Sequence, residues 1–203
     1  SIVPISKRGR ALSYYTASIL FGVIIGPILG GIIVPLYGKS SPFIFYSLMT
    51  LAGLLITRYF ITNTVKISTN RSPFSLNHLK NRSLLLVSLS TFAFAFSWTG
   101  LELTVIPIFA YDKLQLSPLL LGLTISIAAV SNLASTLFAG HLTDRFGRKK
   151  PIILSLFCTA IVAYCLSLSY SFYSLLFFMS LFGLSSGFWG QTQAWAADLS
   201  DKK

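Results

Sequence analysis

Residues 140–150 read Gly-His-Leu-Thr-Asp-Arg-Phe-Gly-Arg-Lys-Lys, a charged stretch between two long uncharged runs. Residues 114–143, which overlap its start, and residues 151–197, which follow it, contain no Asp, Glu, Lys or Arg. A helix that crosses the hydrocarbon core of a bilayer needs about 20 mostly apolar residues. The first run is therefore long enough for one membrane-spanning helix, and the second for two helices that are split at the polar patch 167–171.

The composition of the whole chain is that of a membrane protein. Of its 203 residues, 54% are hydrophobic and only 10% are charged, whereas soluble domains carry roughly 25% charged residues. So few charges cannot cover the surface of a water-soluble core. The composition excludes a soluble enzyme, a secreted disulfide scaffold and a disordered tail, and it makes the lipid bilayer the first partner of the chain.

Six membrane-spanning helices are predicted when the lengths of the apolar runs are compared in the same way along the whole chain. The sequence predicts an all-α integral membrane protein with spans at Ala11–Tyr37, Ser41–Asn63, Ser83–Tyr111, Pro118–His141, Pro151–Tyr170 and Ser171–Ala197.

The basic residues alternate between the two sides of these spans. Fourteen of the sixteen Lys and Arg residues lie in the N-terminal arm, the second and fourth loops and the C-terminal tail. Because cytoplasmic loops collect Lys and Arg, both ends of the chain are expected in the cytoplasm, as in a multi-pass protein of the cell membrane. The net charge of +11 then reflects topology, and no nucleic-acid partner is expected.

A glycine ridge is predicted on the first span. Gly22, Gly26 and Gly30 are four residues apart, so they share one helix face and allow another helix to approach the backbone. Pro27 and Gly31 complete the ridge, and Pro27 removes a hydrogen bond and bends the helix. The spacing alone favours a generic packing face of small residues.

The charged loop contains a set of candidate functional residues. Gly140 permits close helix contact, Gly147 permits a tight turn, and the carboxylate of Asp144 can stabilise the N-terminus of a neighbouring helix. An ordinary cytoplasmic loop explains the bases but not the order of the residues. The set comprises Gly140, Asp144, Arg145, Gly147, Arg148 and Lys149.

Both segments resemble motifs of the major facilitator superfamily. The loop resembles the family signature G-x-x-x-D-R-x-G-R-[RK], and the first span resembles the fifth-helix motif G-x-x-x-G-P-x-x-G-G, although Ser13 stands where that motif usually has a further glycine. The resemblance implies a partial major-facilitator fold with helices five to ten of twelve. It divides the chain into the end of the first six-helix half (residues 1–63), a cytoplasmic central linker (64–82) and the start of the second half (83–203).

The resemblance also implies a function. It points to a secondary transporter that moves a small solute by alternating access, with coupling to protons left open, and that is a monomer when full length. It implies that the charged loop is a gating loop, in which Asp144 approaches the start of the first span, near Arg8 and Arg10, when the cytoplasmic side is closed. The alternative is a truncated remnant that inserts into the membrane but transports nothing. No enzyme, metal or cofactor site is expected, because the spans hold no catalytic constellation and no metal-ligand spacing.

Three residues are candidates for binding substrate or protons. Glu102 is the only acid within a predicted span. It is either an interfacial side chain that reaches water, or a carboxylate that couples protons or binds a cation beside Trp98. Asn132 either bonds a neighbouring helix or binds substrate. All three are predicted to face the protein interior, whereas Trp189 and Trp195 are interpreted as anchors at the membrane interface.

Overall fold

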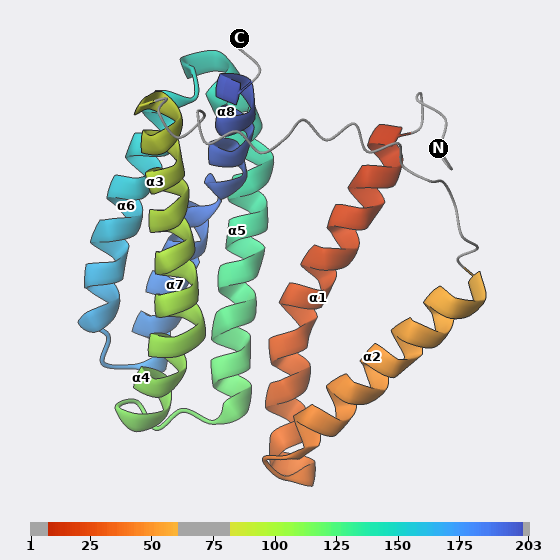
Figure 1. Cartoon of the computed structure of the whole chain (residues 1–203). Helices are drawn as coiled ribbons and strands as arrows, with labels where there is room; N and C mark the ends of the chain where they lie inside the picture. Colours follow the sequence, from red (N-terminus) through yellow and green to blue (C-terminus); the bar gives the residue numbers. More distant parts are fainter. Residues whose placement is uncertain (1–7, 61–81, 201–203) are drawn as a thin grey trace.

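The computed structural model describes residues 8–60 and 82–200, which form a bundle of helices (Figure 1). No strand occurs among these residues. Residues 61–63 of the second predicted span and residues 64–81 of the predicted linker lie outside the described residues. In chain order the elements are α1 (Arg8–Tyr37), α2 (Ser41–Phe60), α3 (Arg82–Phe96), the π-helical segment η3 (Ser97–Val105), α4 (Ile106–Asp112), α5 (Pro118–Phe146), α6 (Lys149–Ser167), α7 (Phe172–Ser186) and α8 (Trp189–Ser200).

The predicted membrane protein with six spans is confirmed. Within the described residues, six helical stretches are long and apolar enough to cross a bilayer. They cover Ser18–Tyr37, Ser41–Phe60, Leu84–Asp112, Pro118–Phe146, Lys149–Ser167 and Phe172–Ala196. The predicted end of the fourth span at His141 is too early, because α5 continues to Phe146 and stops only at Gly147, whose φ of 75° ends the helix.

The third span changes its hydrogen-bond register near its middle. Pro107 has no backbone N–H and its ring crowds the carbonyl four residues earlier. Just before it, the N–H of Ile106 donates to the carbonyl of Leu101, a spacing of five residues. The third span therefore stays continuous through the π-helical segment η3. The sequence had predicted a plain α-helix over the same residues.

The last span is interrupted at Gly187. A side chain at this glycine would collide with α5, since its Cβ would lie 2.6 Å from the Cβ of Ser135. The hydroxyl of Thr136 donates to the Gly187 carbonyl at 3.1 Å. A side chain of α5 thus pairs a backbone group at the break between α7 and α8, where the sequence predicted one unbroken helix.

α5 is the central helix, with α1 on one side and α3, α6, α7 and α8 on the other (Figure 1). Two of its contacts bring backbones together. A Cβ on Gly122 would meet the carbonyl of Pro27 in α1, and a Cβ on Gly183 of α7 would meet the carbonyl of Ala128 in α5. The hydroxyl of Ser126 adds a hydrogen bond of 2.6 Å to the carbonyl of Ile24.

Only part of the predicted ridge supplies this close approach, namely Pro27 and Gly31. Nothing in the described part lies within 4 Å of a Cβ built on Gly22 or Gly26. Gly30 and Gly26 instead face Tyr46 of α2, whose hydroxyl donates to the Gly26 carbonyl at 2.8 Å. Besides the contact of Pro27 with Gly122, the backbone approach on α1 occurs at Gly31, where a Cβ would lie 2.6 Å from the carbonyl oxygen of Pro118.

We expect Gly122→Ala to weaken the packing of α1 on α5, because the added methyl group would overlap the Pro27 carbonyl. Overpacking of this kind costs about 1–3 kcal/mol, so the midpoint of thermal unfolding in detergent should fall. Gly22→Ala is the matched control, since its methyl group meets nothing within 4 Å and alanine favours the helix. Equal midpoints for the two variants would contradict the proposed contact.

Candidate functional site

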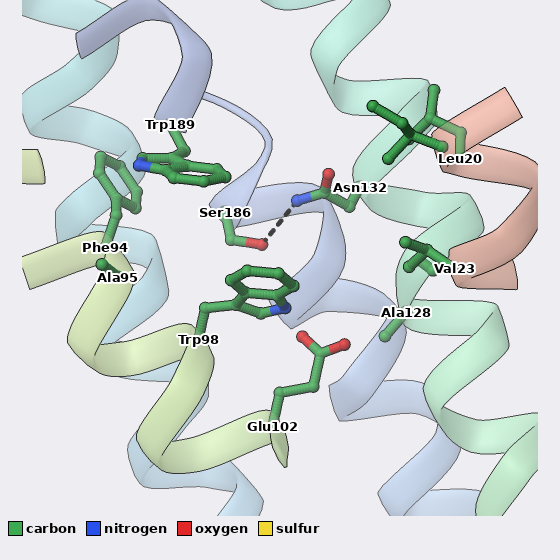
Figure 2. A pocket seen from close by; sticks show the side chains of 12 residues that line it. Leu20, Val23, Phe94, Ala95, Trp98, Glu102, Ala128, Asn132, Ser186 and Trp189 are labelled. Carbon is green, nitrogen blue, oxygen red and sulfur yellow. Dashed lines mark hydrogen bonds between the residues drawn. The ribbon is translucent and has the colours of Figure 1, made fainter. Parts of the chain in front are cut away.

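A cavity of about 180 Å³ lies between α1, the third span, α5 and the break between α7 and α8 (Figure 2). It brings together residues that are far apart in the sequence and that come from four of the six spans. Its lining consists of Ile19, Leu20, Val23, Phe94, Ala95, Trp98, Glu102, Ala128, Ala129, Asn132, Ser186 and Trp189.

Among the described residues, Glu102 is the only ionisable side chain in this lining. The residue is 5% exposed, which contradicts the interpretation of an interfacial side chain that reaches water. η3 carries both Glu102 and Trp98, and Figure 2 shows the indole nitrogen of Trp98 pointing toward the carboxylate. No Lys, Arg or His of the described residues lines the cavity, so no basic side chain in the lining balances a negative charge on Glu102.

Two tryptophans form an aromatic wall beside the carboxylate. The ring centroids of Trp98 and Trp189 lie 5.8 Å apart with an angle of 38° between the rings. Trp189, interpreted from the sequence as an interface anchor, lines the cavity just after the break at Gly187, and its side chain is 39% exposed. The position of Trp189 at the cavity could have been predicted only if the sequence Ser-Ser-Gly-Phe-Trp-Gly, residues 185–190, had been interpreted as a helix break.

Asn132 bridges two helices at the cavity wall. Its side-chain amide donates to the hydroxyl of Ser186 at 3.0 Å (Figure 2). The Ser186 hydroxyl in turn donates to the carbonyl of Gly183 at 3.2 Å. Asn132 therefore joins α5 to α7, and it also lines the cavity, so the geometry is compatible with either predicted role.

The charged loop lies away from this cavity, at the end of α5. Asp144 is exposed, and the Arg145 guanidinium lies 5.4 Å from the ring centroid of Phe146. Gly147 makes the predicted turn with a φ of 75°. The close helix contact expected at Gly140 is absent within the described part, because nothing lies within 4 Å of a Cβ built there. Arg148 and Lys149 lead into α6.

Toward this same end of the bundle, α1 leans away from α5 (Figure 1). The two helices meet closely at the opposite end, where Gly31 packs on Pro118. The arrangement is therefore closed at the loop between α4 and α5 and splayed at the charged loop. The expected approach of Asp144 to the start of α1 concerns a state closed at the charged loop, so it stays a prediction.

Comparison with known proteins gives consistent matches over the chain. Multidrug resistance protein MdtG of Proteus mirabilis is 25% identical over 161 residues, which are 76% of this chain and 40% of that protein. Multidrug resistance protein 2 of Bacillus subtilis is 28% identical over 80% of this chain and 43% of its own length. The synaptic vesicular amine transporter of Bos taurus is 22% identical over 84% of this chain and 33% of its own length.

The chain thus spans less than half the length of these three relatives. The model of the Major Facilitator Superfamily matches residues 1–102 and 87–203, which together include every residue. The chain belongs to the Major Facilitator Superfamily.

Proposed function

We propose that this chain forms the substrate-binding region of a secondary transporter that carries a small organic cation by alternating access and exchanges it for protons at Glu102. The protein that contains it works as a monomer in the cell membrane, with both ends of this chain in the cytoplasm, and has no enzymatic activity. The observation that carries this proposal is the buried carboxylate of Glu102 in a cavity where the described residues place no basic side chain.

The chemistry of the cavity supports a cationic substrate. A charged group inside a membrane protein is expensive and is normally paired or functional. The carboxylate of Glu102 can bind a positive charge, and no basic side chain of the described residues pairs with it in the lining. Trp98 and Trp189 contribute two indole rings to the cavity wall, and the face of an indole ring attracts cations more strongly than other aromatic side chains do. An amphiphilic amine or quaternary ammonium compound fits the acidic, aromatic and otherwise apolar wall.

The names of the relatives agree with this class of substrate. Two are described as multidrug resistance proteins and one as a vesicular amine transporter. An amine carries a positive charge at neutral pH when its pKa lies well above 7, and it then suits the single carboxylate of the cavity.

The arrangement of α1 and α5 supports alternating access. The helices are closed against each other at Gly31 and Pro118 and splayed at the charged loop (Figure 1). With the charged loop in the cytoplasm, as its Lys and Arg residues favour, this arrangement corresponds to a state open to the cytoplasm. A rocking motion that closes the splayed end would bring Asp144 toward the start of α1.

One observation favours the alternative of a membrane-inserted chain that transports nothing. α2 buries none of its residues against the rest of the described chain, so the six spans alone leave long apolar faces without protein partners. Transport assays of this chain alone and of the complete reading frame that contains it distinguish the two functions, because only the alternative predicts that both fail.

We expect Glu102→Gln to abolish the dependence of uptake on a proton gradient, because the amide keeps the shape of the side chain but can neither ionise nor release a proton. The measurement is uptake of an organic cation into vesicles that contain the full protein, with and without an imposed gradient. Affinity for the cation should fall at least tenfold.

Glu102→Asp is the matched control, since it keeps the carboxylate and should retain proton dependence at reduced rate. Proton-driven uptake that survives unchanged in Glu102→Gln would remove this residue from the mechanism.

Asp144→Asn should shift the protein toward the arrangement that is splayed at the charged loop and slow the transport cycle. In the closed arrangement, the carboxylate would interact with the N-terminus of α1, a contact worth up to ~2 kcal/mol when it is partly buried. Turnover reports the shift, as does the labelling, from each side of the membrane, of cysteines that are introduced into the cavity. Asp112→Asn, which removes an exposed carboxylate beyond the other end of the bundle, should leave both unchanged, and a similar effect of the two variants would count against the contact.

Asn132 and Ser186 should behave as one structural pair. Interhelical hydrogen bonds in membranes contribute about 0.6 kcal/mol on average and ~1.7 at most. A double-mutant cycle of Asn132→Ala and Ser186→Ala, followed by thermal unfolding in detergent, should give a coupling energy in this range. A coupling near zero, together with a loss of substrate affinity only in Asn132→Ala, would instead assign Asn132 to substrate binding.

A further inference from the structure

The amide of Asn132 has a fixed orientation, because Ser186 can serve it only as an acceptor. The hydroxyl of Ser186 has a single proton, which it donates to the carbonyl of Gly183 at 3.2 Å. Toward Asn132 the Ser186 oxygen must therefore accept, and only the Nδ2 atom of the amide can donate. The observed hydrogen bond of 3.0 Å from Nδ2 has this direction. The acceptor end of the amide, Oδ1, is thus turned away from Ser186 (Figure 2).

The Oδ1 atom of Asn132 is a free acceptor in the wall of the cavity around Glu102. Among the described residues, the hydroxyl of Thr136 donates to the backbone carbonyl of Asn132, and none donates to Oδ1. Protein does not enclose this atom either, since the one buried side-chain oxygen without a partner in the described part belongs to Ser169. Because Asn132 lines the cavity, its Oδ1 atom is open to a ligand there.

Asn132 and Glu102 lie at different depths of the cavity. Glu102 precedes the end of α4 at Asp112 by ten residues, and Asn132 follows the start of α5 at Pro118 by fourteen. At a rise of about 1.5 Å per residue, Asn132 is roughly 6 Å farther from the loop between α4 and α5. Figure 2 shows the ring of Trp98 between the two side chains. A single ammonium group therefore cannot bond both of them, whereas a molecule with two separate polar groups can.

We propose that the cavity selects organic cations that carry a hydrogen-bond donor, a hydroxyl or N–H group, separate from the cationic group. This inference rests on the proposed function: the cationic group binds at Glu102, the donor bonds Oδ1 of Asn132, and the apolar part between them packs on Trp98. Asn132 is then a specificity-determining residue, whose Nδ2 atom anchors the amide to α7 while Oδ1 recognises the substrate. A cation without the donor leaves this acceptor without a partner, which is unfavourable in a mostly apolar cavity.

Aromatic amines that differ in one polar group test this specificity. Tyramine and its meta isomer carry a phenol hydroxyl, O-methyltyramine keeps the oxygen without its proton, and phenethylamine has no oxygen; all are cations at neutral pH. Their binding to the complete protein that contains this chain is measured by isothermal titration in detergent. A hydrogen bond between uncharged groups raises affinity roughly three- to tenfold. The better-binding phenol should exceed both O-methyltyramine and phenethylamine by this factor.

Three variants separate recognition of the substrate from packing of the helices. Asn132→Leu keeps the size of the side chain but removes the acceptor, so it should abolish the preference for the phenol and change the affinity for phenethylamine little. Thr136→Val is the matched control, because it removes a hydrogen bond of 3.1 Å from α5 to the Gly187 carbonyl at a residue that does not line the cavity. The preference should persist in it. Ser186→Ala releases the amide and should weaken the preference without abolishing it.

Glu102→Gln distinguishes failure of this inference from failure of the proposed function. It should weaken the binding of every amine by a similar factor and leave the preference for the phenol in place. Equal affinities for all the amines, each still lowered in Glu102→Gln, would overturn the role of Asn132 alone, as would a preference that survives in Asn132→Leu. If no amine binds, or if Glu102→Gln leaves binding unchanged, the proposed function falls together with this inference.

Discussion

The backbone contacts of α5 with α1 and α7 are the constraint on which the rest of the structure depends. Lipid chains are as apolar as leucine, so helices in a bilayer gain little from hydrophobic burial and associate through close packing and hydrogen bonds. Gly122 and Gly183 permit such packing, since each faces a carbonyl group of the neighbouring helix. These two contacts hold α1 and α7 on opposite sides of α5. The cavity around Glu102 lies between the elements that they hold in place.

The irregular parts of the backbone coincide with the cavity. Unpaired N–H and carbonyl groups are not tolerated where they face lipid, so breaks in a helix occur where protein or a cavity can satisfy them. η3 carries Trp98 and Glu102, and the break at Gly187 separates Ser186 from Trp189. All four of these side chains line the cavity. The departures from regular helix thus supply most of its polar and aromatic wall.

Hydropathy and the positions of the charged residues were enough to predict six spans, because membrane insertion depends on the average property of about 20 residues. The same averages cannot predict the π-helical segment η3, for which Pro107 is the only indication in the local sequence. They also cannot predict the break at Gly187, because this glycine is needed for its close contact with Ser135 of another helix. Without that break, the place of Trp189 beside the cavity could not be predicted from the sequence. The glycine spacing correctly marked α1 as a packing helix, but spacing does not identify the partner of each face. In the structure Gly26 faces Tyr46, whereas the backbone contact occurs at Gly31.

Glu102 and the absence of basic residues around it constrain how the proposed exchange would work. The lining of the cavity offers one carboxylate and no compensating base in the described part of the chain. An ionised carboxylate at low dielectric is costly unless a positive charge neutralises it. A bound organic cation or a proton would each neutralise Glu102, whereas both together would leave a net positive charge in the same apolar space. On this argument a single carboxylate is sufficient to make the two ligands exclude each other, and exchange requires no second titrating group in the cavity.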